Sequence, residues 1–216
     1  MKNKIIFVIM LIWGICFYGN ATQAYQTQIV LGAKSVQVDS PETTNTFYGE
    51  LVGQENIFSV TGQKDFALYV NILTPDTFGS RKDFLIEISQ DGKVLASLDG
   101  VNFQWKNFYE SFAGDNYWKG PDYNSPVSAG TYRIRVTNPG NAGKYALVIG
   151  KTPSASMDVT LRSILLIPQI KTYFFGESLF SAYCNQITIL AMIGLMSLIG
   201  MGVILIMLYY HKKESS

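Results

Sequence analysis

Aromatic rings and hydrogen-bonding side chains are concentrated in one stretch of the chain, from residue 103 to residue 123. The stretch holds eight aromatic residues, interleaved with amides, carboxylates and lysines. Flat rings cover the apolar face of a pyranose while amides and carboxylates bind its hydroxyls, so this composition is suited to sugar binding. The predicted ligand-binding residues are Trp105, Tyr109, Tyr117, Trp118, Tyr123, Asp115 and Asp122.

The same aromatic stretch has a second interpretation. Gly114, Gly120, Pro121 and Pro126 predict a structured loop rather than a linker. A long loop needs apolar side chains to pack back onto the rest of a domain. Two hypotheses therefore stay open: the rings cap the core, or they contact a ligand or partner.

Three carboxylates in or near this stretch could bind calcium, which takes six to eight oxygen ligands. They are Glu110, Asp115 and Asp122, and no EF-hand loop accompanies them. The alternative is that they are solvated surface carboxylates. No other cofactor is expected.

Catalysis by a histidine-assisted nucleophile is excluded in the body of the chain. The only histidine is His211, close to the C-terminal end. A Ser-His-Asp or Cys-His centre and an imidazole-based zinc site both need a histidine. The scattered acidic residues show no spacing that singles out a catalytic pair, so we expect no enzyme activity.

Charge and cysteine content narrow the possible partners. Residues 25–186 carry 13 Lys plus Arg against 15 Asp plus Glu. Such a balance is not that of a nucleic-acid-binding surface. Cys16 lies in the expected signal peptide and Cys184 beside the expected anchor, so no disulfide is expected within the mature chain.

A run of 24 residues without a charge, 187–210, precedes His211, Lys212 and Lys213. As a helix it would extend about 36 Å, enough to cross a hydrocarbon core of about 30 Å. The following lysines predict a cytoplasmic tail, 211–216, by the positive-inside rule. The sequence thus predicts one C-terminal transmembrane helix in a lipid bilayer.

The N-terminal residues 1–24 predict a signal peptide. Lys2 and Lys4 precede the apolar residues 5–18, and small residues at 21–24 supply a cleavage region. Cleavage would give a single-pass type I protein of the cell membrane with an extracytoplasmic ectodomain. An uncleaved signal anchor is the alternative.

Residues 25–150 predict a β-sandwich ectodomain. Short segments rich in Val, Ile, Phe and Tyr alternate with turn residues, and none shows a sustained helical stripe. Asp91-Gly92 predicts a tight hairpin turn. We therefore expect an all-β, antiparallel, jelly-roll-like sandwich. The predicted strands are 35–38, 47–51, 57–60, 66–73, 84–89, 94–98, 132–137 and 145–149.

Three of these segments carry a resemblance to a known family. They read NTFYGELVGQENIFSV, KDFLIEISQDGKVLASL and AGTYRIRVTNPGNAGKYALVIG. In this order they resemble the bacterial pre-peptidase C-terminal domain, a jelly-roll-like module of secreted hydrolases and surface proteins. The resemblance covers about residues 45–150 and implies a non-catalytic binding or stabilising module. The calcium sites of some relatives have no matching ligand motif here.

Residues 151–186 predict an amphipathic juxtamembrane stalk. Asp158 could cap a helix that Pro168 would interrupt, with Arg162 and Lys171 as its cations. The stalk would lie along the membrane surface, pack under the sandwich or contact a partner subunit. The sequence as a whole predicts a surface-displayed, non-enzymatic module that binds a polysaccharide or an envelope protein. The alternative is an accessory or scaffold subunit of a membrane complex, held through the stalk and the transmembrane helix.

Overall fold

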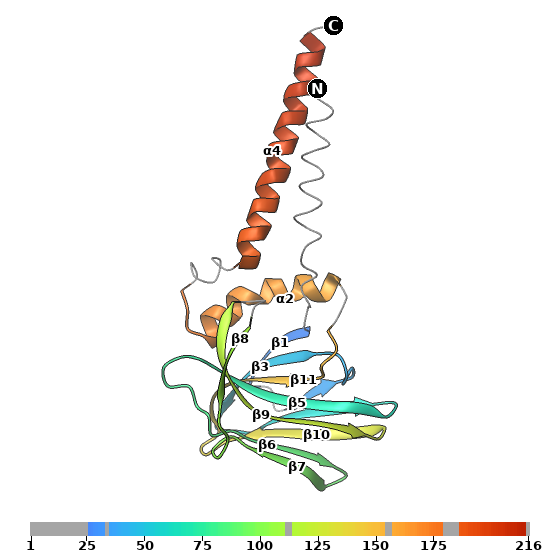
Figure 1. The fold of residues 1–216 in the computed structure, drawn as a ribbon, viewed down its shortest axis with the longest axis vertical. Helices are drawn as coiled ribbons and strands as arrows, with labels where there is room; N and C mark the ends of the chain where they lie inside the picture. The colour runs from blue at the N-terminus through green and yellow to red at the C-terminus, as the bar shows by residue number, and fades with distance from the viewer. Residues whose placement is uncertain (1–25, 33–34, 111–113, 154–156, 179–185, 215–216) are drawn as a thin grey trace.

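Two packed β-sheets form the body of the molecule (Figure 1). The computed structural model describes residues 26–32, 35–110, 114–153, 157–178 and 186–214. The predicted signal peptide, Cys16 and Cys184 lie outside these residues. Within them the strands are β1 (Gln26–Leu31), β2 (Ser35–Val38), β3 (Asn45–Val52), β4 (Asn56–Gly62), β5 (Phe66–Pro75), β6 (Leu85–Gln90), β7 (Lys93–Asp99), β8 (Lys106–Glu110), β9 (Asp115–Val127), β10 (Gly130–Thr137) and β11 (Ala142–Ile149).

The expected all-antiparallel pairing is wrong at one edge of each sheet. The larger sheet has the order β1-β3-β11-β5-β9-β8 and the smaller sheet has the order β2-β4-β10-β6-β7. β1 pairs with β3 in parallel, and β2 pairs with β4 in parallel. The chain alternates between the sheets through its first strands, so strands two apart run in the same direction. Alternating hydrophobicity cannot report this, because it marks the faces of a strand and not its partner.

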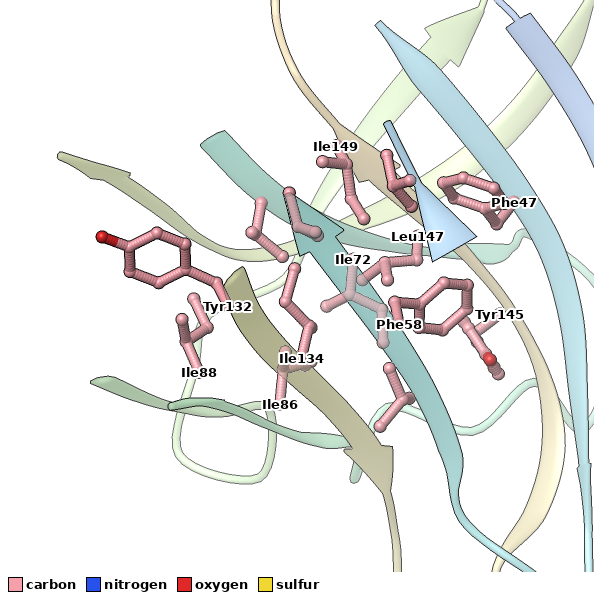
Figure 2. Close-up of a cluster of buried hydrophobic side chains, with 14 of the residues drawn as sticks. Phe47, Phe58, Ile72, Ile86, Ile88, Tyr132, Ile134, Tyr145, Leu147 and Ile149 are labelled. Atoms are coloured by element: carbon pink, nitrogen blue, oxygen red, sulfur yellow. The ribbon is translucent and has the colours of Figure 1, made fainter. Parts of the chain in front are cut away.

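The core lies between the inner faces of the two sheets (Figure 2). Tyr132, Ile134 and Val136 of β10 are buried there, as their period-two pattern predicts. Arg135 points the other way and pairs with Glu87 across the strands at 3.0 Å. Alternation along each strand therefore separates core from solvent, and the hydrophobic effect drives the packing of the sheets.

All eight predicted strands are present, and the Asp91-Gly92 turn is confirmed. Both turn residues have positive φ, 49° and 78°, as a type I′ hairpin requires. The aromatic stretch, expected as a loop, instead contributes β8 and β9. β9 pairs along β5, and a register irregularity between Asn71 and Leu73 accommodates Gly120 and Pro121. Proline and glycine thus mark a bulge here rather than a loop.

The expected stalk packs against the outer face of the larger sheet. Helix α2 (Met157–Gln169) is followed at once by the π-helical turn η1 (Ile170–Phe174). Figure 1 shows α2 between the strands and the last helix, α4 (Gln186–Glu214). Pro168 lies inside α2 and does not end it. The irregularity that proline causes appears just after it, as the wider turn η1. We call α2 and η1 together the roof.

Residues 187–210, the predicted anchor, belong to the single helix α4. Among the residues that can be assessed in this structure, no helix has both the length and the apolar character needed to cross a membrane. The side chains at 187–191, 208 and 209 lie outside the described part of the chain.

Candidate functional site

The three predicted tryptophan and tyrosine contacts at 105, 118 and 123 do not form an open binding face. Trp105 is half-buried against the core, and its indole N–H donates to the Gly100 carbonyl at 2.8 Å. Tyr123 also packs against the core. One face of the Trp118 ring is covered by the Lys82 ammonium, 3.2 Å from the ring centroid. Trp105 and Tyr123 therefore pack against the core, and Trp118 contacts Lys82.

Tyr117 is fully buried on the outer face of the larger sheet. Its hydroxyl lies 2.9 Å from the Tyr48 hydroxyl, and its ring meets the Phe175 ring edge-on at 5.1 Å. Burial, above all, raises the pKa of both tyrosines well above the ordinary value. The two phenols therefore remain neutral hydrogen-bonding groups at any physiological pH.

Of the three predicted carboxylates, the fold places Glu110 opposite Asp115 in the β8–β9 pairing and leaves Asp122 apart from both. Asp115 is buried, and its Oδ1 accepts a hydrogen bond from the Lys171 ammonium at 2.5 Å. Its Oδ2 has no hydrogen-bond partner among the described residues. Asp122 is exposed further along β9, opposite Asn71. In the described part of the chain, no cluster of His, Cys, Asp and Glu side chains is arranged to hold a metal ion.

A cavity of about 360 Å³ lies between the roof and the outer face of the larger sheet. We call it the roofed pocket. Of the predicted ligand-binding residues, Tyr109 and Tyr117 line it. The complete lining is Thr27, Thr44, Thr46, Tyr48, Tyr69, Asn71, Leu73, Phe108, Tyr109, Glu110, Tyr117, Lys119, Val148, Gly150, Lys151, Ser163, Ile167 and Ile170.

Strand alternation explains why one row of β5 faces this pocket. Tyr69, Asn71 and Leu73 line it, whereas Leu68, Val70 and Ile72 are buried in the core between the sheets. The Asn71 amide nitrogen donates to the carbonyls of Gly120 and Pro121, each at 3.1 Å, so its position is fixed. The sheet side of the pocket is therefore a rigid wall, whereas Thr44, Gly150 and Lys151 line the pocket from outside the strands.

Three of the polar side chains in the lining are Lys151, Tyr69 and Thr44. The Lys151 ammonium lies 4.4 Å from the Tyr69 ring centroid. Burial first, and then the nearby charge of Asp122, raise the pKa of Tyr69 to about 12. Tyr69 therefore stays protonated and can donate a hydrogen bond at neutral pH. Thr44 contributes a buried hydroxyl that has no hydrogen-bond partner among the described residues.

Apolar packing and one buried ion pair hold the roof in place. Ile167, Ile170 and Phe174 are buried against the sheet. The Phe174 ring meets Tyr48 edge-on at a centroid distance of 5.0 Å. Lys171 reaches Asp115 on β9, 56 positions away in sequence. The roof is thus part of the folded body, and this packing confirms one of the three positions expected for the stalk.

Most pocket residues were missed by the sequence analysis because they come from distant segments. Tyr48, Tyr69, Lys119 and Lys151 belong to four different parts of the chain. One signal was available on β5, where Tyr69, Asn71 and Leu73 alternate with core residues. A strand whose second face carries aromatic and amide groups indicates a covered face, but it does not reveal what covers it.

No protein-family model and no curated protein matches the chain. Its fold is similar to the pre-peptidase C-terminal domain of collagenase from Bacillus anthracis, at 11% identity and a TM-score of 0.34, over 56% of this chain and 95% of that one. It is also similar to PliG, a periplasmic lysozyme inhibitor of Salmonella Typhimurium, at 16% identity and a TM-score of 0.31, over 55% of this chain and 98% of that one.

A family 35 carbohydrate-binding module from an environmental isolate is similar at 16% identity and a TM-score of 0.30, over 64% of this chain and 96% of that one. TM-scores this low carry no argument about function. The β-sandwich assignment rests on the strand pairing of this chain.

Proposed function

We propose that the chain is a non-enzymatic, membrane-tethered module that binds its ligand in the roofed pocket. The observation that carries this proposal is the cavity of about 360 Å³ between the roof and the larger sheet. Its size is that of a small-molecule site, and its wall combines apolar side chains with a few fixed polar groups. Because the sequence holds no histidine before His211, the polar groups are better suited to binding than to proton transfer.

The volume of the pocket limits what can enter it. A polysaccharide or an envelope protein, the partners expected from the sequence, would have to insert a single end group. Tyr109 supports such an arrangement, because it lines the pocket and yet 58% of its surface is exposed. Its ring could contact the part of a long ligand that remains outside.

The tether in this proposal is the charge-free segment 187–210. Its support is the sequence pattern, the continuous helix α4, and the exposed apolar side chains on the described part of that helix, such as Met196 and Ile206. With the N-terminal signal peptide, this would place the sandwich and the roofed pocket outside the cytoplasm as a type I protein.

A second candidate function is an accessory subunit of a membrane complex. The exposed apolar side chains of α4 favour it, since another helix could cover them. The roof does not favour it, because Ile167, Ile170 and Phe174 are already buried against the sheet. A partner subunit would therefore have to be held through α4.

Ligand titrations followed by methyl NMR test the pocket directly. The full chain in lipid nanodiscs would be titrated with neutral and acidic trisaccharides and with six-carbon alcohols and acids. We expect the methyl signals of Leu73 and Ile167 to shift with at least one probe. Val148→Phe should block the shifts by filling the pocket, whereas Val52→Phe, at an exposed site outside it, should not. If no probe shifts these signals, the proposed binding site is wrong.

A further inference from the structure

Two lysines line the roofed pocket. Lys119 projects from β9 beside Leu73, and Lys151 follows β11 and covers the ring of Tyr69. Neither makes an ion pair within the part of the chain that the structure describes. Tyr69 and Leu73 are four residues apart on one strand, about 13 Å. The two cations therefore stand toward opposite ends of the pocket.

The acidic side chain in the lining does not cancel these two charges. Glu110 is the one carboxylate among the described lining residues. It lies opposite Asp115 in the β8–β9 pairing, at the end of the pocket where Lys171 is buried. Among the lining side chains two cations stand against one anion, and Asp122, outside the lining, adds a negative charge near Tyr69. The positive charge is therefore local to the two ammonium groups, where it attracts an anion at short range.

A buried hydroxyl adds a hydrogen-bond donor to the pocket. Thr44 is 6% exposed, and its Oγ1 has no partner among the described residues. Leaving a buried hydroxyl unpaired costs free energy that a ligand oxygen would recover. An ionised oxygen would recover more than a neutral one, because charge-assisted hydrogen bonds are the stronger ones.

The middle of the wall includes an apolar patch, beside the small polar side chains in the lining. Leu73 and Val148 of the sheet face Ile167 and Ile170 of the roof across the cavity. We infer that the roofed pocket takes a ligand group with one acidic function, a carboxylate or a phosphate monoester, on a compact apolar body. The inference rests on the proposed function and names the class of ligand for the same site.

Two sources could supply this chemistry: a free amphipathic acid, or an acidic sugar at the end of a polysaccharide. Hexanoate and hexyl phosphate represent the first source, with hexanol as their neutral counterpart. Trigalacturonate represents the second source, with maltotriose as its neutral counterpart. The full chain in nanodiscs of zwitterionic lipid would be titrated with each probe and followed through the Leu73 and Ile167 methyl signals.

We expect at least one acidic probe to bind ten times more tightly than its neutral counterpart, and to weaken as salt is added. Lys119→Gln or Lys151→Gln should reduce that affinity about tenfold, the effect of losing one charge-assisted contact worth about 1.4 kcal/mol. Lys64→Gln and Lys93→Gln, at exposed positions outside the pocket, serve as matched controls and should change nothing.

Equal affinity for acidic and neutral probes would overturn the inference and leave the proposed function standing. An equal loss of affinity in the control variants would also overturn it, because the attraction would then be a property of the whole surface. A complete lack of response to all five probes would instead contradict the proposed function itself.

Discussion

Single residues of the aromatic stretch differ in what surrounds them, and this decides their roles. Trp105 packs against the core beside Gly120, where an added Cβ would come within 2.6 Å of the indole ring. Trp118 is held by Lys82 on one face. Tyr109 is the most exposed of these three rings, at 58%. The composition of the stretch does not distinguish these three rings, whereas their packing gives each a different role.

Trp105→Ala should lower the free energy of unfolding by about 3 kcal/mol, because it leaves a cavity beside the core. Trp118→Ala should cost about 1 kcal/mol, the order of one cation–π contact and partial burial. Tyr109→Ala should change the free energy of unfolding by less than about 0.5 kcal/mol. Chemical denaturation of the full chain measures all three. A Trp105→Ala variant of unchanged stability that no longer binds ligand would show that Trp105 is a contact residue.

The Asp115–Lys171 pair is buried on both sides, with side-chain exposures of 2% and 5%. Burial raises the pKa of the Asp115 carboxyl, and the hydrogen bond and charge of Lys171 only partly oppose it; Glu177 and Glu110 raise it further. The folded state therefore binds the Asp115 proton more tightly than the unfolded state does. The stability contributed by protonated Asp115 is present at low pH and is lost as the pH rises through the raised pKa.

Unfolding curves recorded from acid to neutral pH should show this loss. Asp115→Asn removes this titration, so the free energy of unfolding of the wild type relative to that of the variant should fall as the pH rises from acid to neutral. Lys171→Met should cost about 3 kcal/mol at neutral pH, whereas the double change Asp115→Leu with Lys171→Met should recover that loss. A difference in the free energy of unfolding between wild type and Asp115→Asn that does not change with pH would contradict the raised pKa of Asp115.

At the scale of elements, β9 and the roof show how context overrides local sequence. β9 contains Gly120, Pro121 and Pro126, residues that are typical of turns. It nevertheless forms a strand, because the edge of β5 offers hydrogen bonds and the rings on its inner face fill the sandwich. The surroundings also decide the role of the amphipathic roof. Its apolar side packs against a protein surface, where the sequence equally allowed a membrane surface.

Phe174→Ala should release the roof while leaving the sandwich folded. The ring contacts both Tyr48 and Tyr117, and losing it should weaken docking by about 3 kcal/mol. Amide exchange in α2 and η1 should then accelerate by about 100-fold, with β10 and β11 unchanged. Leu165→Ala, at a position of α2 that is 75% exposed, is the control. Accelerated exchange throughout the sandwich would mean that the roof and the core unfold as one unit.

At the scale of the whole molecule, the proposed tether can be tested independently of the pocket. Wild-type protein should remain with membranes after alkaline carbonate washing. A double change of Ile199→Lys and Val203→Lys places two charges in the middle of 187–210, at about 3 kcal/mol each, and should release the protein. Leu95→Lys with Val101→Lys adds the same charge to exposed sites of the sandwich, and this control should leave the protein with the membranes. Release of the wild-type protein would refute the tether.

The β-sandwich could be predicted from the sequence because its signal is local. Ile134 and Val136 alternate with arginines on β10, and Asp91-Gly92 allows the positive φ values of a tight turn, so faces and turns are encoded within a few residues. The parallel edges and β9 could not be predicted in this way. They depend on which strand becomes a neighbour, and that is decided by contacts far apart in the chain.

The sequence by itself determined the two-layer β body, the absence of histidine chemistry before His211 and the charge-free segment 187–210. Only the tertiary structure decided that Trp105 and Tyr123 pack against the core, that Lys171 pairs with Asp115, and that a cavity lies beneath α2. The physical reason is the separation in sequence over which each interaction acts. Periodicity and turn chemistry act between near neighbours, whereas burial and a pocket exist only once distant surfaces have come together.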